Sequence, residues 1–322
     1  MKKIFSLMCG MAIALFCTNT MMAQNESQTA LLQDGDSMQV FYGAGALSSA
    51  YAAATDGSTI SLSEGFFNYP GVYLTKAVNI IGCGSDKTTI NSGLNYLAEE
   101  SAPVQNVLLE GVRVNGDILL SSISGLTIAK CRFGVLQPRG GTMENITIRQ
   151  SQFVTLAGGA YVLNMAVLNC IITSRQDYSN ESSALLFDHC VIMPSSNCWD
   201  HAKAIYQNCI AAAGCNTNFA AGSTVRYCIC QFGDADKYIK EGNWFGVDPT
   251  NLFSDGTGFD YSDERTYTLS TPETYVGSDG TEVGIHGGLY PWNMTPSTPV
   301  VTNLQLQVNG AMLNVTYDAE VR

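Results

Sequence analysis

The middle of the chain alternates apolar and polar residues in short runs that recur at a nearly constant interval. In each unit every second residue is apolar, then two positions are skipped, and the alternation starts again at a cysteine or small residue. Val107–Val114 is an example. An apolar period of two predicts strands, because helices repeat every 3.6 residues. The cysteine-equivalent positions lie 19 or 20 residues apart: Val112, Cys131, Ser151, Cys170, Cys190, Cys209 and Cys228.

Each unit therefore predicts two short strands joined by a tight bend, with the same face turned inward on both. Units of this length stack as the coils of a parallel β-solenoid. The residue before the cysteine position is the bend residue, and three of these seven are glycine or asparagine, which adopt a left-handed backbone at least cost. His189 belongs to this series, so we interpret it as a bend residue in preference to a catalytic one.

The chain has 11 cysteines, and most of those after the first segment follow the repeat. A small apolar thiol suits a stacked core, so we expect five of them to be buried and reduced: Cys131, Cys170, Cys190, Cys209 and Cys228. Cys198 and Cys215 fall outside this register and are the predicted disulfide candidate. A zinc site at Cys198, His201 and His189 is disfavoured, because no second closely spaced ligand pair accompanies the first.

The first residues follow the pattern of a secretory signal peptide. Lys2 and Lys3 precede an apolar run over Ile4–Phe16, and Ala23 stands at a cleavage position. An N-terminal membrane anchor is disfavoured because this run is too short to span a bilayer. A lipoprotein site at Cys17 is a further alternative. We therefore predict a signal peptide over residues 1–23, no later transmembrane segment, and export to the periplasm, the cell surface or the medium.

The region before the repeats has an order of elements that is typical of a solenoid cap. A helix-forming run over Ala46–Ala54 is followed by Asp56-Gly57, a strand over Thr59–Leu62, Glu64-Gly65-Phe66, and Val78–Gly84. This order resembles the N-terminal cap and first coils of the pectin-lyase-type parallel β-helix superfamily, over about residues 45–290. The resemblance implies an all-β fold: a right-handed single-stranded parallel β-helix with an N-terminal capping helix.

The C-terminal part predicts a closing segment and a hairpin. Gly277–Gly288 is rich in Asp and Gly and is similar to the closing segment of secreted bacterial β-helix proteins. Turn chemistry explains this cluster, and calcium is the alternative, although the spacing does not match an EF-hand loop. Residues 300–308 and 311–317 alternate around Asn309-Gly310, which predicts a β-hairpin that packs on the solenoid or is part of a β-sandwich. The predicted domains are 24–294 and 295–322.

Composition and charge narrow the classes of function. Hydrophobic residues make up 46% and charged residues 14% of the chain, which excludes a disordered protein. The net charge is −12 with 16 Lys and Arg residues, so nucleic acid is not an expected partner. We expect a monomer, with a polysaccharide or a cell-surface glycan as its partner.

The superfamily that the chain resembles contains polysaccharide lyases, pectin esterases and polygalacturonases, as well as non-catalytic surface and adhesin-like proteins. Typical hydrolase patterns, Asn-Thr-Asp followed by Asp-Asp and then Arg-Ile-Lys, do not occur, nor does the Arg-x-Pro-x-x-Arg of pectate lyases. The leading hypothesis is therefore a secreted, non-catalytic protein that binds glycan or acts as a surface scaffold. The alternative is a polysaccharide lyase or glycoside hydrolase that acts on an acidic polysaccharide.

Candidate binding residues come from the longest interruptions of the repeat, because function in solenoids often lies on such loops. These interruptions are Gln137–Glu144, Arg175–Ser182 and Pro194–Lys203, which recur in the same part of the repeat and should project from one side. Their aromatic rings can stack on sugars while their charged groups bond hydroxyls. No catalytic residue and no cofactor are assigned, calcium being the alternative. The candidate glycan-binding residues are Arg139, Arg175, Asp177, Tyr178, Trp199, Asp200 and His201.

Overall fold

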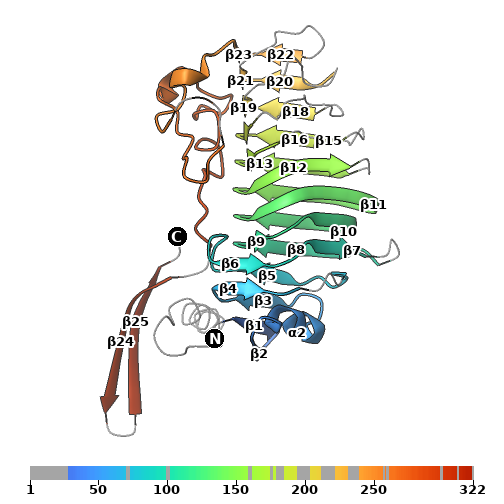
Figure 1. Ribbon diagram of the computed structural model, residues 1–322, viewed down its shortest axis with the longest axis vertical. Helices are drawn as coiled ribbons and strands as arrows, with labels where there is room; N and C mark the ends of the chain where they lie inside the picture. Colours follow the sequence, from blue (N-terminus) through green and yellow to red (C-terminus); the bar gives the residue numbers. More distant parts are fainter. Residues whose placement is uncertain are drawn as a thin grey trace.

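The protein is a parallel β-solenoid of about seven turns, as Figure 1 shows for the computed structural model. The model describes residues 28–69, 73–98, 102–158, 162–174, 177–178, 185–193, 204–211, 222–230, 239–256, 258, 261–297, 300–309 and 312–320. Of residues 97, 177, 178, 239, 300–309 and 312–320 it describes the backbone alone. This architecture confirms the predicted all-β parallel β-helix.

Two rows of strands run along the solenoid, one on each side of the bend. The first row contains β3 (Thr59–Leu62), β5 (Asn79–Ile81), β8 (Val104–Glu110), β10 (Ile118–Ala129), β11 (Arg132–Arg149), β13 (Leu163–Leu168), β16 (Leu185–Asp188), β18 (Ala204–Gln207), β20 (Thr224–Arg226) and β22 (Ile239–Glu241). The second row contains β4 (Gly65–Phe67), β6 (Thr88–Ile90), β9 (Arg113–Val114), β12 (Gln152–Gly158), β14 (Ile171–Ile172), β17 (Val191–Ile192), β19 (Ile210–Ala211), β21 (Ile229–Cys230) and β23 (Trp244–Phe245). The long strand β11 contributes its beginning to the second row and its end to the first.

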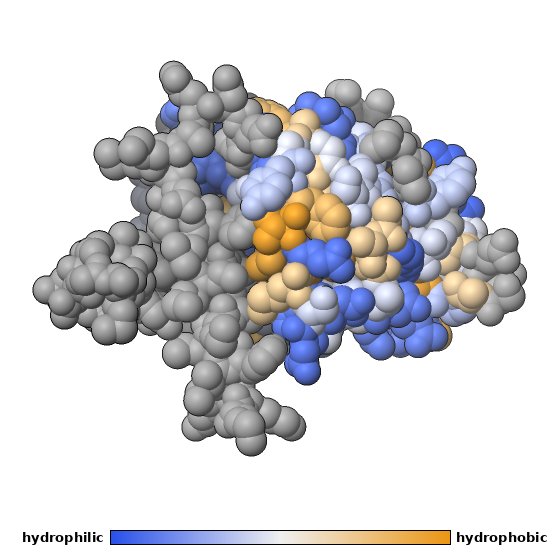
Figure 2. All heavy atoms as spheres, turned by 90° about the horizontal axis from the view of Figure 1, so that it is seen from below, coloured by the Kyte–Doolittle hydropathy of each residue, from blue (hydrophilic) through white to orange (hydrophobic). Residues whose placement is uncertain are grey.

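The N-terminal end of the solenoid is closed by two antiparallel strands and a helix. β1 (Thr29–Asp34) pairs with β3 on one side and with β2 (Ser37–Tyr42) on the other. Helix α2 (Ala46–Ala53) follows, and its Ala46, Leu47, Ala50 and Tyr51 are buried in the core. This is the predicted capping helix, and Figure 2 looks directly at this end of the molecule.

The bend is the feature that the sequence defines best. All seven predicted bend residues have a left-handed backbone, with φ between 47° and 67°: Gly111, Lys130, Gln150, Asn169, His189, Asn208 and Tyr227. The prediction rested on the one glycine and two asparagines among them, yet the other four residues adopt the same conformation. Stacking forces this result, because each bend must follow the bend of the coil below it.

The cysteine column is buried and its thiols are free, as predicted, and Cys230, which pairs with Ala211 in the second row, is also buried and free. The thiols also bond the backbone: Cys209 Sγ donates to the carbonyl of Gln207 at 3.0 Å and accepts from the Cys190 N–H at 3.4 Å. Ser151 Oγ accepts from the Cys131 N–H in the same way at 3.1 Å. Burial raises the pKa of the Cys131 thiol to about 12, so it stays protonated.

The disulfide expectation is not tested, and one further cysteine is disulfide-bonded. Cys198 and Cys215, the predicted disulfide candidate, lie outside the described residues. Cys83, which the sequence did not single out, is disulfide-bonded. It lies in the register of the column, since Ile81 pairs with Glu110 and Cys83 is therefore level with Val112.

The prediction of a loop over Gln137–Glu144 is wrong. These residues belong to β11, where Pro138 pairs with Leu120 and Gly140 with Ser121. Arg139 is the extra residue at this irregularity of register, and its side chain is exposed. The proline and glycines that suggested a loop are accommodated as a bulge, because neighbouring β10 offers backbone partners on both sides of it.

The remaining strands belong to a third, shorter row. β7 (Leu94–Leu97) pairs with the beginning of β10, which pairs with the middle of β11, and β15 (Asp177–Tyr178) pairs with the end of β12. The predicted hairpin forms from β24 (Val300–Asn309) and β25 (Met312–Glu320), a separate two-stranded sheet that points away from the coils in Figure 1. In the described ranges, no helix is long and apolar enough to cross a membrane.

The C-terminal segment packs on the outside of the last coils. The second-row strands there turn an apolar side chain outward as well as inward: Ile171, Val191, Ile210 and Ile229 face out. They form a second apolar cluster with the segment that carries η1 (Pro249–Asn251) and η2 (Pro272–Thr274), through Leu252, Phe253, Tyr267, Leu269, Val283 and Ile285. The solenoid is therefore covered on this side by its own chain.

Candidate functional site

The outer face of the first row carries a shallow groove that crosses β11, β13, β16, β18 and β20. Its volume is about 430 Å³, and we call it the outer groove. The residues that define it are Asn145, Asn164, Leu186, Ile205, Gln207 and Arg226. It has an apolar floor between two polar rims, and strand register explains each part.

The floor is a row of small and apolar side chains. Thr147 pairs with Ala166, Ala166 with Leu186, and Leu186 with Ile205, so the four lie side by side on successive coils. Paired residues of parallel strands share a face, and the residues between them point into the core. Ile205 is 36% exposed. The floor therefore offers apolar contact to a ligand that lies along the solenoid axis.

One rim consists of asparagines within β11 and β13. Asn145 and Asn164 have φ of 55° and 58°, in line with Asn106 and Gly125 of the coils below. The side-chain amide of Asn164 donates to Oδ1 of Asn145 at 3.2 Å. Both asparagine side chains are exposed. Because an amide has two donors and a carbonyl with two lone pairs, each side chain retains capacity to bond a ligand.

The other rim is a short chain of charged and polar groups at the ends of the same strands. Asp188, Gln207 and Arg226 pair in register on successive coils. Arg226 Nε donates to Oε1 of Gln207 at 2.9 Å, and Gln207 Nε2 donates to Oδ2 of Asp188 at 2.9 Å. The guanidinium at the groove is therefore held in position by two neighbouring coils.

Beyond this rim, the chain returns along the bend residues in reverse order. We call residues 277–297 the C-terminal strap. Asn208, His189, Asn169, Gln150 and Lys130 each bond it in turn. The corresponding strap residues are Ser278, Gly284, Gly287, Pro291 and Thr295. The left-handed bend aims each of these side chains outward, so five of the seven bend residues serve as a row of attachment points for the strap.

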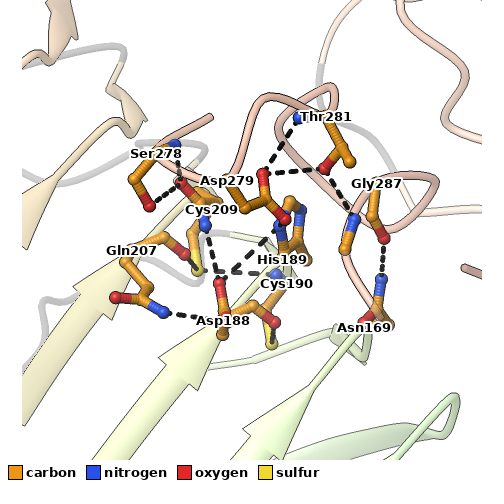
Figure 3. Close-up of polar contacts among 12 residues, drawn as sticks. Asn169, Asp188, His189, Cys190, Gln207, Cys209, Ser278, Asp279, Thr281 and Gly287 are labelled. Carbon is orange, nitrogen blue, oxygen red and sulfur yellow. Dashed lines mark hydrogen bonds and ion pairs between the residues drawn. The ribbon is translucent and has the colours of Figure 1, made fainter. Parts of the chain in front are cut away.

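His189 is the centre of this attachment, as Figure 3 shows. Its Nδ1 lies 3.2 Å from the carbonyl oxygen of Gly284, and its Nε2 lies 3.1 Å from Oδ2 of Asp279. Asp188 Oδ1 is 3.8 Å from the same Nε2. The His189 side chain is 2% exposed. The interpretation of His189 as a bend residue is confirmed, and its side chain also clamps the strap.

The Asp-Gly cluster of the strap has the turn chemistry that the sequence suggests. Asp279 Oδ1 accepts from the N–H and the hydroxyl of Thr281 at 3.0 and 2.9 Å. Burial opposes ionisation of Asp279, but the Thr281 bonds and His189 outweigh it and lower the pKa of this carboxyl below its usual value. Gly288 must be glycine, because a Cβ there would lie 2.5 Å from the His189 ring.

The sequence analysis left calcium as an alternative at the Asp-Gly cluster and disfavoured a zinc site that included His189. Across the part of the chain that the structure describes, no three His, Cys, Asp or Glu side chains converge as a metal site would require. Both carboxylate oxygens of Asp279 are bonded within the protein, one by Thr281 and one by His189. Cys198 and His201, the disfavoured zinc pair, lie outside the described residues.

The predicted glycan-binding residues are only partly described. The side chains of Arg175, Trp199, Asp200 and His201 lie outside the described residues, as do those of Asp177 and Tyr178. The backbone of Asp177 pairs with Ala157 of β12, and the preceding part of β12 pairs with β11 just before Arg139. The register thus brings Arg139 and the backbone of Asp177 and Tyr178 to one region, and Arg139 does not line the outer groove.

The sequence analysis missed the outer groove and the strap. A signal for the strap was present, because doubled apolar residues such as Ile171-Ile172 and Val191-Ile192 replace the single inward residue of earlier coils. Two adjacent apolar residues in a strand imply that both faces are buried. The groove had no comparable signal, since its residues are ordinary outward positions that become neighbours only through register.

The chain was compared with models of protein families, with curated proteins and with solved structures, and none of them matches. The parallel solenoid is consistent with the β-helix architecture that the sequence resembles. Any assignment of activity must therefore start from the groove, the strap and the chemistry of their residues.

Proposed function

We propose that this protein is exported and binds glycan along the outer groove without transforming it. The observation that carries the proposal is that the groove crosses successive coils in register, with an apolar floor between amide and guanidinium donors. Neighbouring strands lie about 4.8 Å apart, so the binding groups repeat at a regular short interval. A linear polymer of similar units matches such a surface better than a single small molecule does.

The chemistry of the groove suits sugars. The floor of Leu186 and Ile205 contacts the C–H faces of sugar rings, and Asn145, Asn164 and Gln207 bond hydroxyl groups. Arg226 adds a positive charge that attracts a carboxylate or sulfate on the polymer. The interruptions after β14 and β17 lead directly into β16 and β18, which carry Leu186 and Ile205.

Binding to a panel of acidic and neutral polysaccharides tests the proposal. The mature protein is compared with Ile205→Ser, which makes the floor polar, and with Val154→Ser as the matched control. Val154 is 41% exposed on β12 and does not line the groove. We expect Ile205→Ser to weaken binding roughly tenfold, because about one buried side chain of apolar contact is lost, and Val154→Ser to leave it unchanged.

The same incubations also test whether the protein cleaves the polysaccharide. Ultraviolet absorbance detects unsaturated uronate, and a reducing-end assay detects hydrolysis. Absorbance or new reducing ends with any polymer would replace the proposal by a lyase or a hydrolase. Absence of binding across the panel, or equal loss in Ile205→Ser and Val154→Ser, would remove the groove as a glycan site.

A further inference from the structure

The N-terminal end of the solenoid finishes in an open strand edge. β2 is the outermost strand, and among the described strands it pairs with β1 alone. Five of its six residues are exposed, with Met38 at 39%, Val40 at 41% and Tyr42 at 66%. These three side chains share one face, because they alternate along the strand. Figure 2 shows apolar surface in the middle of this end of the molecule, with hydrophilic groups around it.

The edge carries none of the usual protection against strand pairing. Soluble proteins protect such edges with lysine, proline, a bulge or an inward charge. The sequence of β2, Ser-Met-Gln-Val-Phe-Tyr, has no charged residue and no proline, and its pairing with β1 is regular. At the opposite end of the first row, β22 has exposed Lys240 and Glu241. Of the two ends of the first row in the described residues, the N-terminal one combines an outermost strand with an uncharged apolar strip.

We propose that the β2 edge pairs with β2 of a second copy of this chain. Two identical strands pair antiparallel about a two-fold axis, and opposite residues must lie on the same face of the joined sheet. This condition is met with Val40 on the axis and Met38 opposite Tyr42 of the other copy. The six apolar side chains then form one continuous strip, and the first-row sheet runs through both molecules.

The charges at the two ends of β2 support a second copy as the occupant. In this register Asp36 of one copy lies opposite Ala44 of the other, next to the beginning of α2. That helix has Gly45 as its N-cap, no side-chain bond to its first N–H groups, and no acidic residue in its first turn. A carboxylate near a helix N-terminus is favourable. The two-fold axis creates this pairing twice and places no like charges opposite each other.

The pairing is closed, because each β2 edge is used once. It produces a dimer with the two solenoids end to end and does not continue into a fibre. The expectation of a monomer came from the sequence, where the outermost position of β2 is not visible. The outer groove lies on later coils, so dimerisation and glycan binding are separate properties.

Sedimentation equilibrium of the mature protein over a wide concentration range tests the dimer. The variant Val40→Lys puts two like charges opposite each other on the axis and removes both valines from the strip. We expect a dissociation constant roughly 100-fold higher than that of the unmodified protein. Val154→Lys is the matched control, with the same 41% exposure on β12, and should dimerise normally. Monomer alone at every concentration, or equal effects of the two substitutions, would overturn the proposal.

Cross-linking tests the register and does not depend on the lysine variant being stable. Val40→Cys places one thiol of each copy on the axis, while the six free native thiols of the described residues are buried. Mild oxidation should give a disulfide-linked dimer with Val40→Cys and none with Val154→Cys. A dimer that Val40→Cys does not cross-link, or assemblies larger than a dimer, would refute this pairing.

Discussion

Replacement of Asn169 should release the C-terminal strap, because one side chain holds two of its carbonyl groups. Asn169 is 2% exposed, and its amide donates to the carbonyl oxygens of Ile285 at 3.0 Å and Gly287 at 2.7 Å. Asn169→Gly keeps the left-handed backbone and removes only these bonds. Asn169→Ala removes the bonds and also leaves a residue with a Cβ, but without the polar side chain by which asparagine tolerates it, in a backbone with φ of 50°.

The magnitudes follow from these two effects. Loss of two hydrogen bonds to buried acceptors should lower the free energy of unfolding by about 2–4 kcal/mol in Asn169→Gly. The left-handed conformation costs a residue with a Cβ about 1–2 kcal/mol, so Asn169→Ala should lose about 1 kcal/mol more. Asn164→Gly is the matched control, since Asn164 has φ of 58° but is exposed and bonds only Asn145 among the contacts described. It should lose under about 1 kcal/mol.

Urea unfolding followed by tryptophan fluorescence measures these differences. Trp292 lies in the strap and packs against the second apolar cluster, so its emission reports strap release directly. Equal losses in Asn169→Gly and Asn164→Gly would show that the strap bonds add nothing to stability. If Asn169→Ala is no less stable than Asn169→Gly, the argument from the left-handed bend fails.

Two further predictions concern the column of thiols and the strap carboxylate. Cys209→Ala removes the acceptor of the Cys190 N–H and should lower the free energy of unfolding by about 1–3 kcal/mol. Cys209→Ser, which copies Ser151, should lower it clearly less. Thermal unfolding of both variants checks this, and equal losses would mean that only the volume of the side chain matters. Asp279 has a lowered pKa in the folded state, so its contribution is present above the unfolded pKa of about 3.9 and is lost as the pH falls through that value towards the folded pKa. The unmodified protein should therefore lose more stability between neutral and acidic pH than Asp279→Asn does; parallel pH profiles in urea would contradict the proposed clamp.

Much of the fold is local and could be predicted. The period of two, the step at the cysteine and the constant spacing define strand, bend and coil without reference to any distant residue. The same reasoning failed at Gln137–Glu144, where Pro138, Gly140 and Gly141 suggested a loop that is a bulged strand. Local turn propensity was outweighed there by backbone partners on the neighbouring coil.

The site is different, because it depends on which residues stacking brings together. Leu186 and Ile205 are 19 residues apart and become neighbours only when β16 pairs with β18. The open edge of β2 follows from its place outside β1, which its own six residues do not reveal. Both features depend on pairing between strands and not on the propensity of either strand.

The sequence by itself determined the coil, because every coil repeats one local pattern and the left-handed bend recurs at each step. It also determined the buried column of cysteines, whose inward position follows from the same period. Only the tertiary structure decided what the bend residues do on their outer side. His189 and Asn169 bond a strap that lies about 90 to 118 residues further along the chain. Contacts over that separation arise from the path of the whole chain, and a local pattern carries no record of that path.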